Sequence, residues 1–309
     1  MEKLKLKSGL NKVPTSEGLM EVQSMFSKRE PEEPRKERPK KCVLILPGSF
    51  YYAELVKDFQ RELLESLQKK FVDHDIEVHA LSLPGRGESE LKGRFHLKPF
   101  NAIMKVLEEI MEKLGEETIL VGHSIGGMVI QKYLEKHLAP AAILLAPANR
   151  SPHLKINVGK YFIRHHKRTM LTFMLTLSPK RVMRPAAVKD MFYSKEINTP
   201  EYNDHLTALT KKLSNESLRF LLGAFTGKLD YEKISRTPIC IFGGEKDVIA
   251  RERGLEWLKN KLDAELIMIP NATHSSLVND KILGITSKEG QVQQVAKHTA
   301  KYLYELAGK

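Results

Sequence analysis

A serine in a short glycine-rich stretch is the residue of this sequence best suited to nucleophilic chemistry. Gly122-His123-Ser124-Ile125-Gly126 fits the pattern G-x-S-x-G, in which a nucleophilic serine stands on a sharp turn between a strand and a helix. The same residues could also form an ordinary loop. A serine alone is a poor nucleophile, so the chemistry requires a base and an acid that orients the base.

Candidates for the base and the acid follow two later apolar runs. His274 lies four residues after Pro270, just past the run "LIMIP", and is the predicted base. The segment "PICIFGGEKDVIA" offers two carboxylates, Glu245 and Asp247. We predict Asp247 as the acid because it lies deeper in the loop, and Glu245 is the alternative. The chain order serine, acid, histidine is the one that accompanies such a turn in an α/β sheet.

Two backbone N–H groups must bind the negative oxygen that forms when a serine attacks a carbonyl. We predict these donors to be the amide of Ile125, directly after the nucleophile, and the amide of Ser49 in "LPGSFYY". Phe50 and His123 adjoin these positions, and we predict that they contact the substrate. Together the residues indicate acyl transfer through an acyl-enzyme.

Metal and cofactor chemistry is not predicted. His165 and His166 are adjacent but have no carboxylate or cysteine at ligand spacing, so two solvated histidines are expected. Cys42 and Cys240 each sit in an apolar run and are predicted to be buried, inert thiols rather than a disulfide. The predicted site therefore holds no metal and no cofactor.

The predicted site needs a sheet to position it. Short apolar runs alternate with amphipathic segments from residue 42 onward, which predicts a mostly parallel sheet with helices on both faces. The expected strands are 42–46, 76–81, 118–122, 141–146, 238–244 and 264–270. The expected helices are 53–71, 103–114, 127–138, 251–262 and 289–306. Ahead of them, 3–7 and 19–26 are weakly strand-like, and the charged, proline-punctuated 28–41 is predicted to be a solvated loop.

One interval interrupts this alternation. Residues 148–236 contain helical patterns without a convincing buried strand, and we predict a helical cap over Ser124. The expected organisation is a first part of the core at 1–147, the cap at 148–236 and a second part of the core at 237–309.

The formal net charge of +12 is concentrated in the cap. Between Ser151 and Lys189 there are nine lysines and arginines and no acidic residue, interleaved with phenylalanines, methionines and leucines. Three roles are compatible with this basic segment. The favoured one is a cap with an apolar side over an acyl pocket and a solvated basic side. The second is contact with an anionic membrane surface, and the third is an anionic substrate. Nucleic-acid binding is not predicted because no motif for it is present.

No secretory signal opens the chain, and no apolar run approaches the ~20 residues of a membrane-spanning helix. We therefore expect a cytoplasmic protein, with peripheral membrane association through the basic cap as the further option. The oligomeric state stays open.

Five stretches, taken in order, resemble one superfamily. "LPGSF", "LSLPGRGESE", "LVGHSIGG", "GGEKD" and "IPNATH" are similar to the oxyanion loop, the following glycine loop, the nucleophile turn, the acid loop and the histidine loop of α/β hydrolases. The closest resemblance is to the single-chain serine esterase/lipase-like branch of bacteria and archaea. Two positions depart from that pattern, with Pro47 in place of the usual histidine and Ser82 in place of the usual aspartate.

The resemblance implies an α/β-hydrolase fold with a mostly parallel sheet of about eight strands and a helical cap. It also implies hydrolysis of carboxylic esters of lipophilic acyl groups by Ser124, Asp247 and His274. Thioesterase, carbon–carbon hydrolase and perhydrolase chemistry on the same three residues remain alternatives, as does a ligand-binding protein without turnover.

Overall fold

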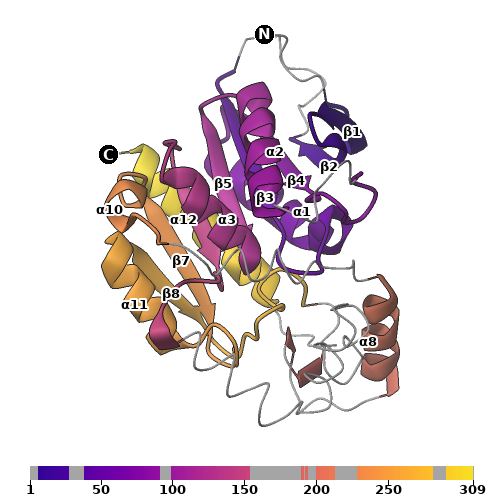
Figure 1. Cartoon of the computed structure of the whole chain (residues 1–309), viewed down its shortest axis with the longest axis vertical. Helices are drawn as coiled ribbons and strands as arrows, with labels where there is room; N and C mark the ends of the chain where they lie inside the picture. The colour runs from indigo at the N-terminus through magenta and orange to yellow at the C-terminus, as the bar shows by residue number, and fades with distance from the viewer. Residues whose placement is uncertain are drawn as a thin grey trace.

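A computed structural model describes residues 6–27, 38–90, 99–153, 189–190, 192–193, 200–212, 228–280 and 290–308. Its centre is an eight-stranded sheet in the order β1-β2-β4-β3-β5-β6-β7-β8 (Figure 1). The strands are β1 (Gly9–Thr15), β2 (Gly18–Phe26), β3 (Lys40–Leu46), β4 (Asp75–Leu81), β5 (Thr118–His123), β6 (Ala142–Leu145), β7 (Ile239–Gly244) and β8 (Glu265–Ile269). From β4 to β8 in this order, neighbouring strands are parallel. Strand β1 pairs antiparallel with β2, and β2 pairs antiparallel with β4. The predicted fold class is confirmed.

Helices cover both faces of this sheet. On one face α1 packs against α12, and on the other α2, α3, α10 and α11 form a continuous layer (Figure 1). Their bounds are η1 (Ala53–Val56), α1 (Lys57–Lys70), α2 (Pro99–Leu114), α3 (Ile125–Leu134), α8 (Pro200–Lys212), α10 (Tyr231–Ile234), α11 (Glu252–Leu262) and α12 (Gln291–Ala307). A parallel sheet covered in this way is buried on both sides.

The composition of the central strands follows from this double burial. Every residue of β5 and β7 is buried; β7 has no polar side chain, and β5 has polar side chains only at its two ends, Thr118 and His123. Helix α1 buries Phe59, Leu63 and Leu67, which recur at four-residue spacing along one face of the helix. The predicted buried state of Cys42 and Cys240 is confirmed, and both thiols are free.

Several predicted bounds differ from the structure. Lys40 and Lys41, at the end of the loop expected at 28–41, belong to β3, and the helix expected at 103–114 begins at Pro99. Residues Leu6 and Lys7 of the expected strand 3–7 are not in a strand, which instead runs from Gly9 to Thr15. The tight turn between Thr15 and Gly18 pairs these two residues, and this pairing fixes the strand directly before the turn. The helix expected at 127–138 begins at Ile125, directly after the nucleophile turn, and ends at Leu134.

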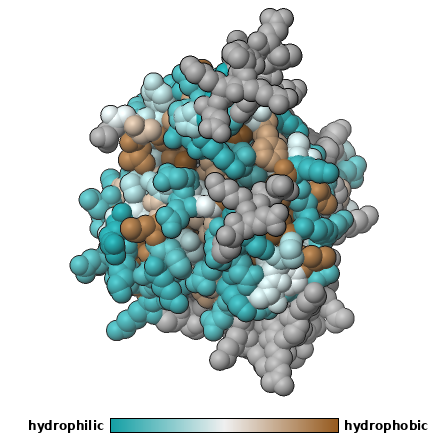
Figure 2. Space-filling view, turned by 90° about the horizontal axis from the view of Figure 1, so that it is seen from above, coloured by the Kyte–Doolittle hydropathy of each residue, from teal (hydrophilic) through white to brown (hydrophobic). Residues whose placement is uncertain are grey.

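Most of the predicted cap lies outside the described residues, including His165, His166 and nearly all of the basic segment. Of the described parts, α8 lies away from the sheet (Figure 1). The cap, its charge and its contact with membranes therefore remain predictions. Among the described residues no helix combines the length and apolar character needed to cross a membrane. The face shown in Figure 2 is largely hydrophilic, with small hydrophobic groups between polar side chains.

Candidate active site

Ser124 stands on a strained turn between β5 and α3. Its backbone has φ 52° and ψ −116°, a conformation that residues with a side chain rarely adopt. Hydrogen bonds hold this conformation in place. The Ser124 amide donates to Leu145 O at 2.9 Å, and its carbonyl accepts from Ala148 N at 2.8 Å. The turn leaves the Ser124 side chain partly exposed, although its neighbours on both sides are buried.

The small residues of the turn are required by the close approach of α3 to the sheet. A Cβ atom built at Gly126 would lie 2.1 Å from the carbonyl oxygen of Leu46, at the end of β3. A Cβ atom at Gly122 would lie 2.7 Å from Gly127 N. Real Cβ atoms do not approach backbone so closely. A larger residue at either position would therefore push α3 away from the neighbouring strands.

His274 lies between Ser124 and Asp247. Its Nε2 is 2.9 Å from Ser124 Oγ, and its Nδ1 is 2.8 Å from Asp247 Oδ2. A carboxylate can only accept, so Nδ1 carries the proton and Nε2 is free to accept from the serine hydroxyl. The structure thus brings together three residues that are widely separated in the sequence, each in a loop that follows a strand.

Asp247 is held by the backbone as well as by His274. Its Oδ1 accepts hydrogen bonds from Ile249 N at 2.7 Å and Ala250 N at 2.9 Å, and its side chain has no exposed surface. These three partners are all donors, which suits an ionised carboxylate. Glu245, the alternative acid, lies elsewhere, and its Oε2 accepts from Asn271 N at an exposed position.

His123, predicted to contact the substrate, is buried directly beneath His274. Its Nε2 donates to the backbone oxygen of His274 at 2.9 Å. Burial, together with the nearby positive charge of His274 when protonated, lowers the pKa of His123 to about 3. His123 is therefore neutral across the physiological range, and it ties the loop of His274 to the strand before Ser124.

The loop after β3 passes close to Ser124. A Cβ atom at Gly48 would lie 2.7 Å from His123 Nδ1 and 3.0 Å from Ser124 Cβ, so only glycine fits there. Ser49 follows directly. Within the described part of the chain, the amides of Ser49 and Ile125 donate to no backbone carbonyl. Both N–H groups are thus available near Ser124, as an oxyanion site requires.

Two buried charged residues near the Ser49 loop were not predicted from the sequence. Arg86 is 2% exposed and donates from Nη1 to Gly48 O at 3.1 Å. Glu21 is 3% exposed and comes from β2, far away in the sequence. Its Oε1 accepts from Ser82 Oγ at 2.6 Å, and its Oε2 accepts from Glu88 N at 2.7 Å.

Glu21 supplies a carboxylate to the loop in which the resemblance expects an aspartate and this chain has Ser82. It anchors the loop 82–89, and that loop carries Arg86 to the carbonyl of Gly48. The serine at position 82 was the sequence feature that could have indicated a buried acid from elsewhere in the chain. A loop that lacks its own buried carboxylate requires another acceptor for its donors. The sequence alone did not show that the N-terminal hairpin provides it.

Aromatic side chains from the described part of the cap interval lie beside His274. The Phe192 ring centroid is 5.8 Å from that of His274 and 6.4 Å from that of Phe50. The hydroxyls of Tyr193 and Tyr51 are 2.6 Å apart, and Ser275 N donates to Phe192 O at 2.9 Å. Phe192 and Tyr193 thus join this interval to both the Ser49 loop and the His274 loop.

The fold and the serine turn define an α/β hydrolase. A family model described as serine aminopeptidase, S33, matches residues 37–281, which is most of the chain. The chain belongs to this family, and the predicted superfamily is confirmed. The hairpin of β1 and β2, which contributes Glu21, precedes the matched segment. No curated protein sequence matches the chain significantly.

Solved structures share the fold at low sequence identity. A carboxylesterase structure from Nitrososphaera gargenis is 16% identical over 97% of this chain and 99% of its own, with a TM-score of 0.66. A structure described as a putative aryl esterase from Burkholderia cenocepacia is 14% identical over 97% and 100%, with a TM-score of 0.63. A monoacylglycerol lipase structure from Paleococcus ferrophilus is 17% identical over 93% and 100%, with a TM-score of 0.57.

Proposed function

We propose that the protein is a serine hydrolase that cleaves carboxylic esters of lipophilic acyl groups. The observation that carries this proposal is the pair of hydrogen bonds that joins Asp247, His274 and Ser124 in series. In that arrangement a neutral imidazole can take the serine proton while a fixed carboxylate stabilises the imidazolium that results.

The reaction begins with attack of Ser124 Oγ on the ester carbonyl as His274 Nε2 takes the hydroxyl proton. The amides of Ser49 and Ile125 bind the oxyanion of the tetrahedral intermediate. His274 then gives its proton to the leaving alcohol, and the ester C–O bond breaks to leave an acyl group on Ser124. Water repeats the same steps on this acyl-enzyme and releases the carboxylic acid. Asp247 keeps its charge throughout and orients His274.

The surroundings of His274 support an apolar acyl or aryl group. The Phe192 ring lies beside the imidazole, and the Phe50 ring lies against Phe192. Such rings favour apolar ligand surface. The carboxylesterase, aryl esterase and lipase named in the structural comparison add support for an ester bond, although they share only the fold with this chain.

The test is a series of p-nitrophenyl esters from acetate to palmitate, together with active-site labelling by a fluorophosphonate. We expect turnover that depends on acyl length, and labelling that Ser124→Ala abolishes while the melting temperature is retained. Ser235→Ala, which changes an exposed serine at the end of α10, is the matched control and keeps both properties.

Other outcomes redirect the proposal. Labelling of Ser124 without ester turnover would favour another acyl substrate, which thioesters and amino-acid p-nitroanilides would then examine. Full ester turnover by Ser124→Ala would refute the mechanism. Absence of both labelling and turnover would favour a ligand-binding protein.

A further inference from the structure

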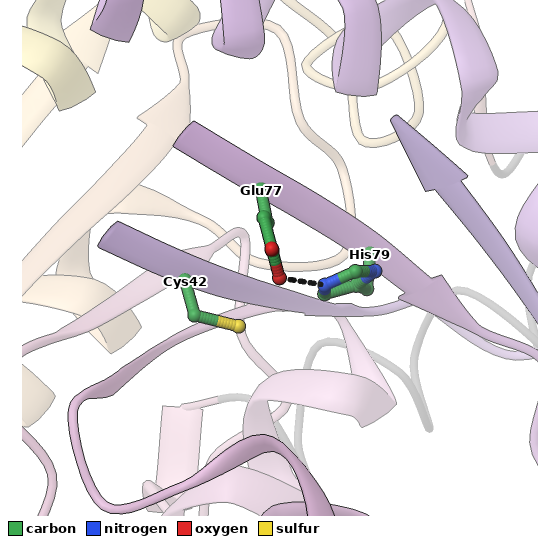
Figure 3. Close-up of side chains that lie close together, drawn as sticks. All are labelled: Cys42, Glu77 and His79. Atoms are coloured by element: carbon green, nitrogen blue, oxygen red, sulfur yellow. Dashed lines mark hydrogen bonds and ion pairs between the residues drawn. The ribbon is translucent and has the colours of Figure 1, made fainter. Parts of the chain in front are cut away.

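A second cluster of reactive side chains lies at the opposite end of the sheet from Ser124. Cys42 is near the start of β3, and Glu77 and His79 are on the neighbouring β4 (Figure 3). Cys42 and Glu77 are register partners, and His79 follows Glu77 by two residues, so all three side chains share one face of the sheet. A donor atom from each lies within 4.8 Å of the other two.

The donor set has the chemistry of a transition-metal site. Thiolate sulfur, imidazole nitrogen and carboxylate oxygen are the three protein ligand types that zinc accepts. His79 Nε2 is 3.3 Å from Glu77 Oε2, close to the ~3.5 Å that separates neighbouring ligands in tetrahedral zinc sites. We propose that Cys42, Glu77 and His79 bind a divalent zinc ion.

The imidazole is already oriented for this role. His79 is fully buried, and its Nδ1 lies 2.9 Å from Ser24 Oγ, which also accepts from Asn11 Nδ2 at 3.3 Å. A hydrogen bond to the second ring nitrogen is what fixes a metal-binding histidine in place. In the metal-free protein, Nε2–H faces and donates to Glu77 (Figure 3). Zinc binding moves the ring proton to Nδ1, which then donates to Ser24 Oγ and leaves Nε2 free to bind the metal.

The site is accessible from a cavity of about 520 Å³, whose lining includes Cys42, Glu77, Lys40 and Glu116. This space leaves room for water as the fourth ligand. Lys40 currently neutralises Glu77, with Nζ 2.5 Å from Oε2. The Lys40 side chain is half exposed and can move into solvent. Zinc would replace its charge, and the thiol proton of Cys42 would leave to solvent.

The test measures metal binding alone, so it does not depend on the proposed esterase activity. Metal-stripped protein is titrated with zinc chloride by calorimetry, and with cobalt(II) while the near-ultraviolet thiolate-to-metal absorption is followed. We expect one zinc per chain and a cobalt–thiolate band. Cys42→Ser should remove the band and weaken zinc binding at least ~100-fold, and His79→Gln should weaken it similarly.

Cys240→Ser is the matched control, because Cys240 is the other buried free cysteine and lies on β7. It should keep both the band and the affinity. Lys40→Met should tighten zinc binding by up to ~10-fold, since it removes the competing cation without touching a ligand. This variant keeps the test decisive even where Cys42→Ser fails to fold. Absence of zinc binding in the parent and in Lys40→Met would overturn the proposal, as would binding that survives Cys42→Ser unchanged.

Discussion

The two ends of the parallel sheet carry reactive side chains that differ in how completely they are arranged for their proposed roles. At the carboxyl end, Ser124, Asp247 and His274 project from loops and are joined by hydrogen bonds that already match the proposed reaction. At the amino end, Cys42 and Glu77 belong to the strands themselves, and Lys40 occupies the carboxylate. The first site needs no rearrangement before it acts, whereas the second must lose a lysine contact and a thiol proton.

The electrostatics of the two ends explain this difference. Burial raises the pKa of Cys42 to about 11, so its thiol stays protonated without a metal. Burial also opposes ionisation of Glu77, but hydrogen bonds from His79 and Lys40 outweigh it and lower the pKa of that carboxyl. Asp247 receives backbone N–H groups and the His274 ring instead of a mobile cation. The candidate active site therefore has its hydrogen-bond donors already in place, whereas the cluster of Cys42, Glu77 and His79 is completed only when a metal binds.

The largest expected effect concerns the acid at the carboxyl end. Asp247→Asn should lower kcat/KM for the best p-nitrophenyl ester by ~10³–10⁴-fold, because an amide no longer imposes the correct tautomer on His274. Glu245→Gln, two residues earlier, should retain activity within about threefold, since it changes an exposed side chain that accepts from Asn271 N. Equal losses in the two variants would contradict the assignment of the acid. Zinc binding at the other end should be unchanged in both.

The close packing of Gly126 against the end of β3 should affect the free energy of unfolding. Gly126→Ala should lower the free energy of unfolding by about 3 kcal/mol or more, because its Cβ would meet Leu46 O at 2.1 Å. Gly254→Ala, in helix α11, meets Ser151 Oγ at 3.3 Å and His153 Cβ at 4.0 Å, and should be neutral or stabilising by up to ~1 kcal/mol. Urea denaturation measures both. A neutral Gly126→Ala would show that the turn can widen.

A smaller effect is expected for the support of the Ser49 loop. Arg86→Met should lower kcat by ~10–100-fold with less change in KM. Gly48 O then keeps the Tyr51 N–H but loses its buried side-chain donor, and the proposed oxyanion amide of Ser49 shifts. The matched control is Arg61→Met, which changes an arginine that bonds Asp58 on the exposed side of α1. A loss confined to KM would indicate a role in substrate binding rather than in positioning.

The last expected effect is a pH dependence of stability due to His123. Its pKa falls from 6.5 to about 3 on folding, so the unfolded state binds more protons between these values. Stability is therefore full above pH 6.5 and falls as the pH decreases, by at most ~1.4 kcal/mol per pH unit from this residue. Denaturation of the parent protein and His123→Gln at several pH values measures the difference. Identical slopes would exclude His123 as the source.

Much of the site at the carboxyl end could be predicted because each of its residues directly follows a strand in the sequence. Parallel strands end at one edge of the sheet, so residues that follow such strands are brought close together whatever the loop details. Ser124, Asp247 and His274 each follow a strand, and the glycines around Ser124 indicated a tight turn. Leu6 and Lys7, which were expected in a strand, lie outside it because a hairpin turn, rather than residue pattern, sets the position of β1.

The sequence by itself determined the alternation of strands and helices, the fold class and the residues that line the carboxyl edge. It could not show which polar residues become neighbours through sheet order and register. Glu21 reaches the loop 82–89 because β2 pairs with β4, and Cys42 meets Glu77 because β3 lies on the other side of β4. Those pairings depend on long-range contacts that no local pattern specifies. Only the tertiary structure therefore revealed the support of the Ser49 loop and the cluster proposed to bind zinc.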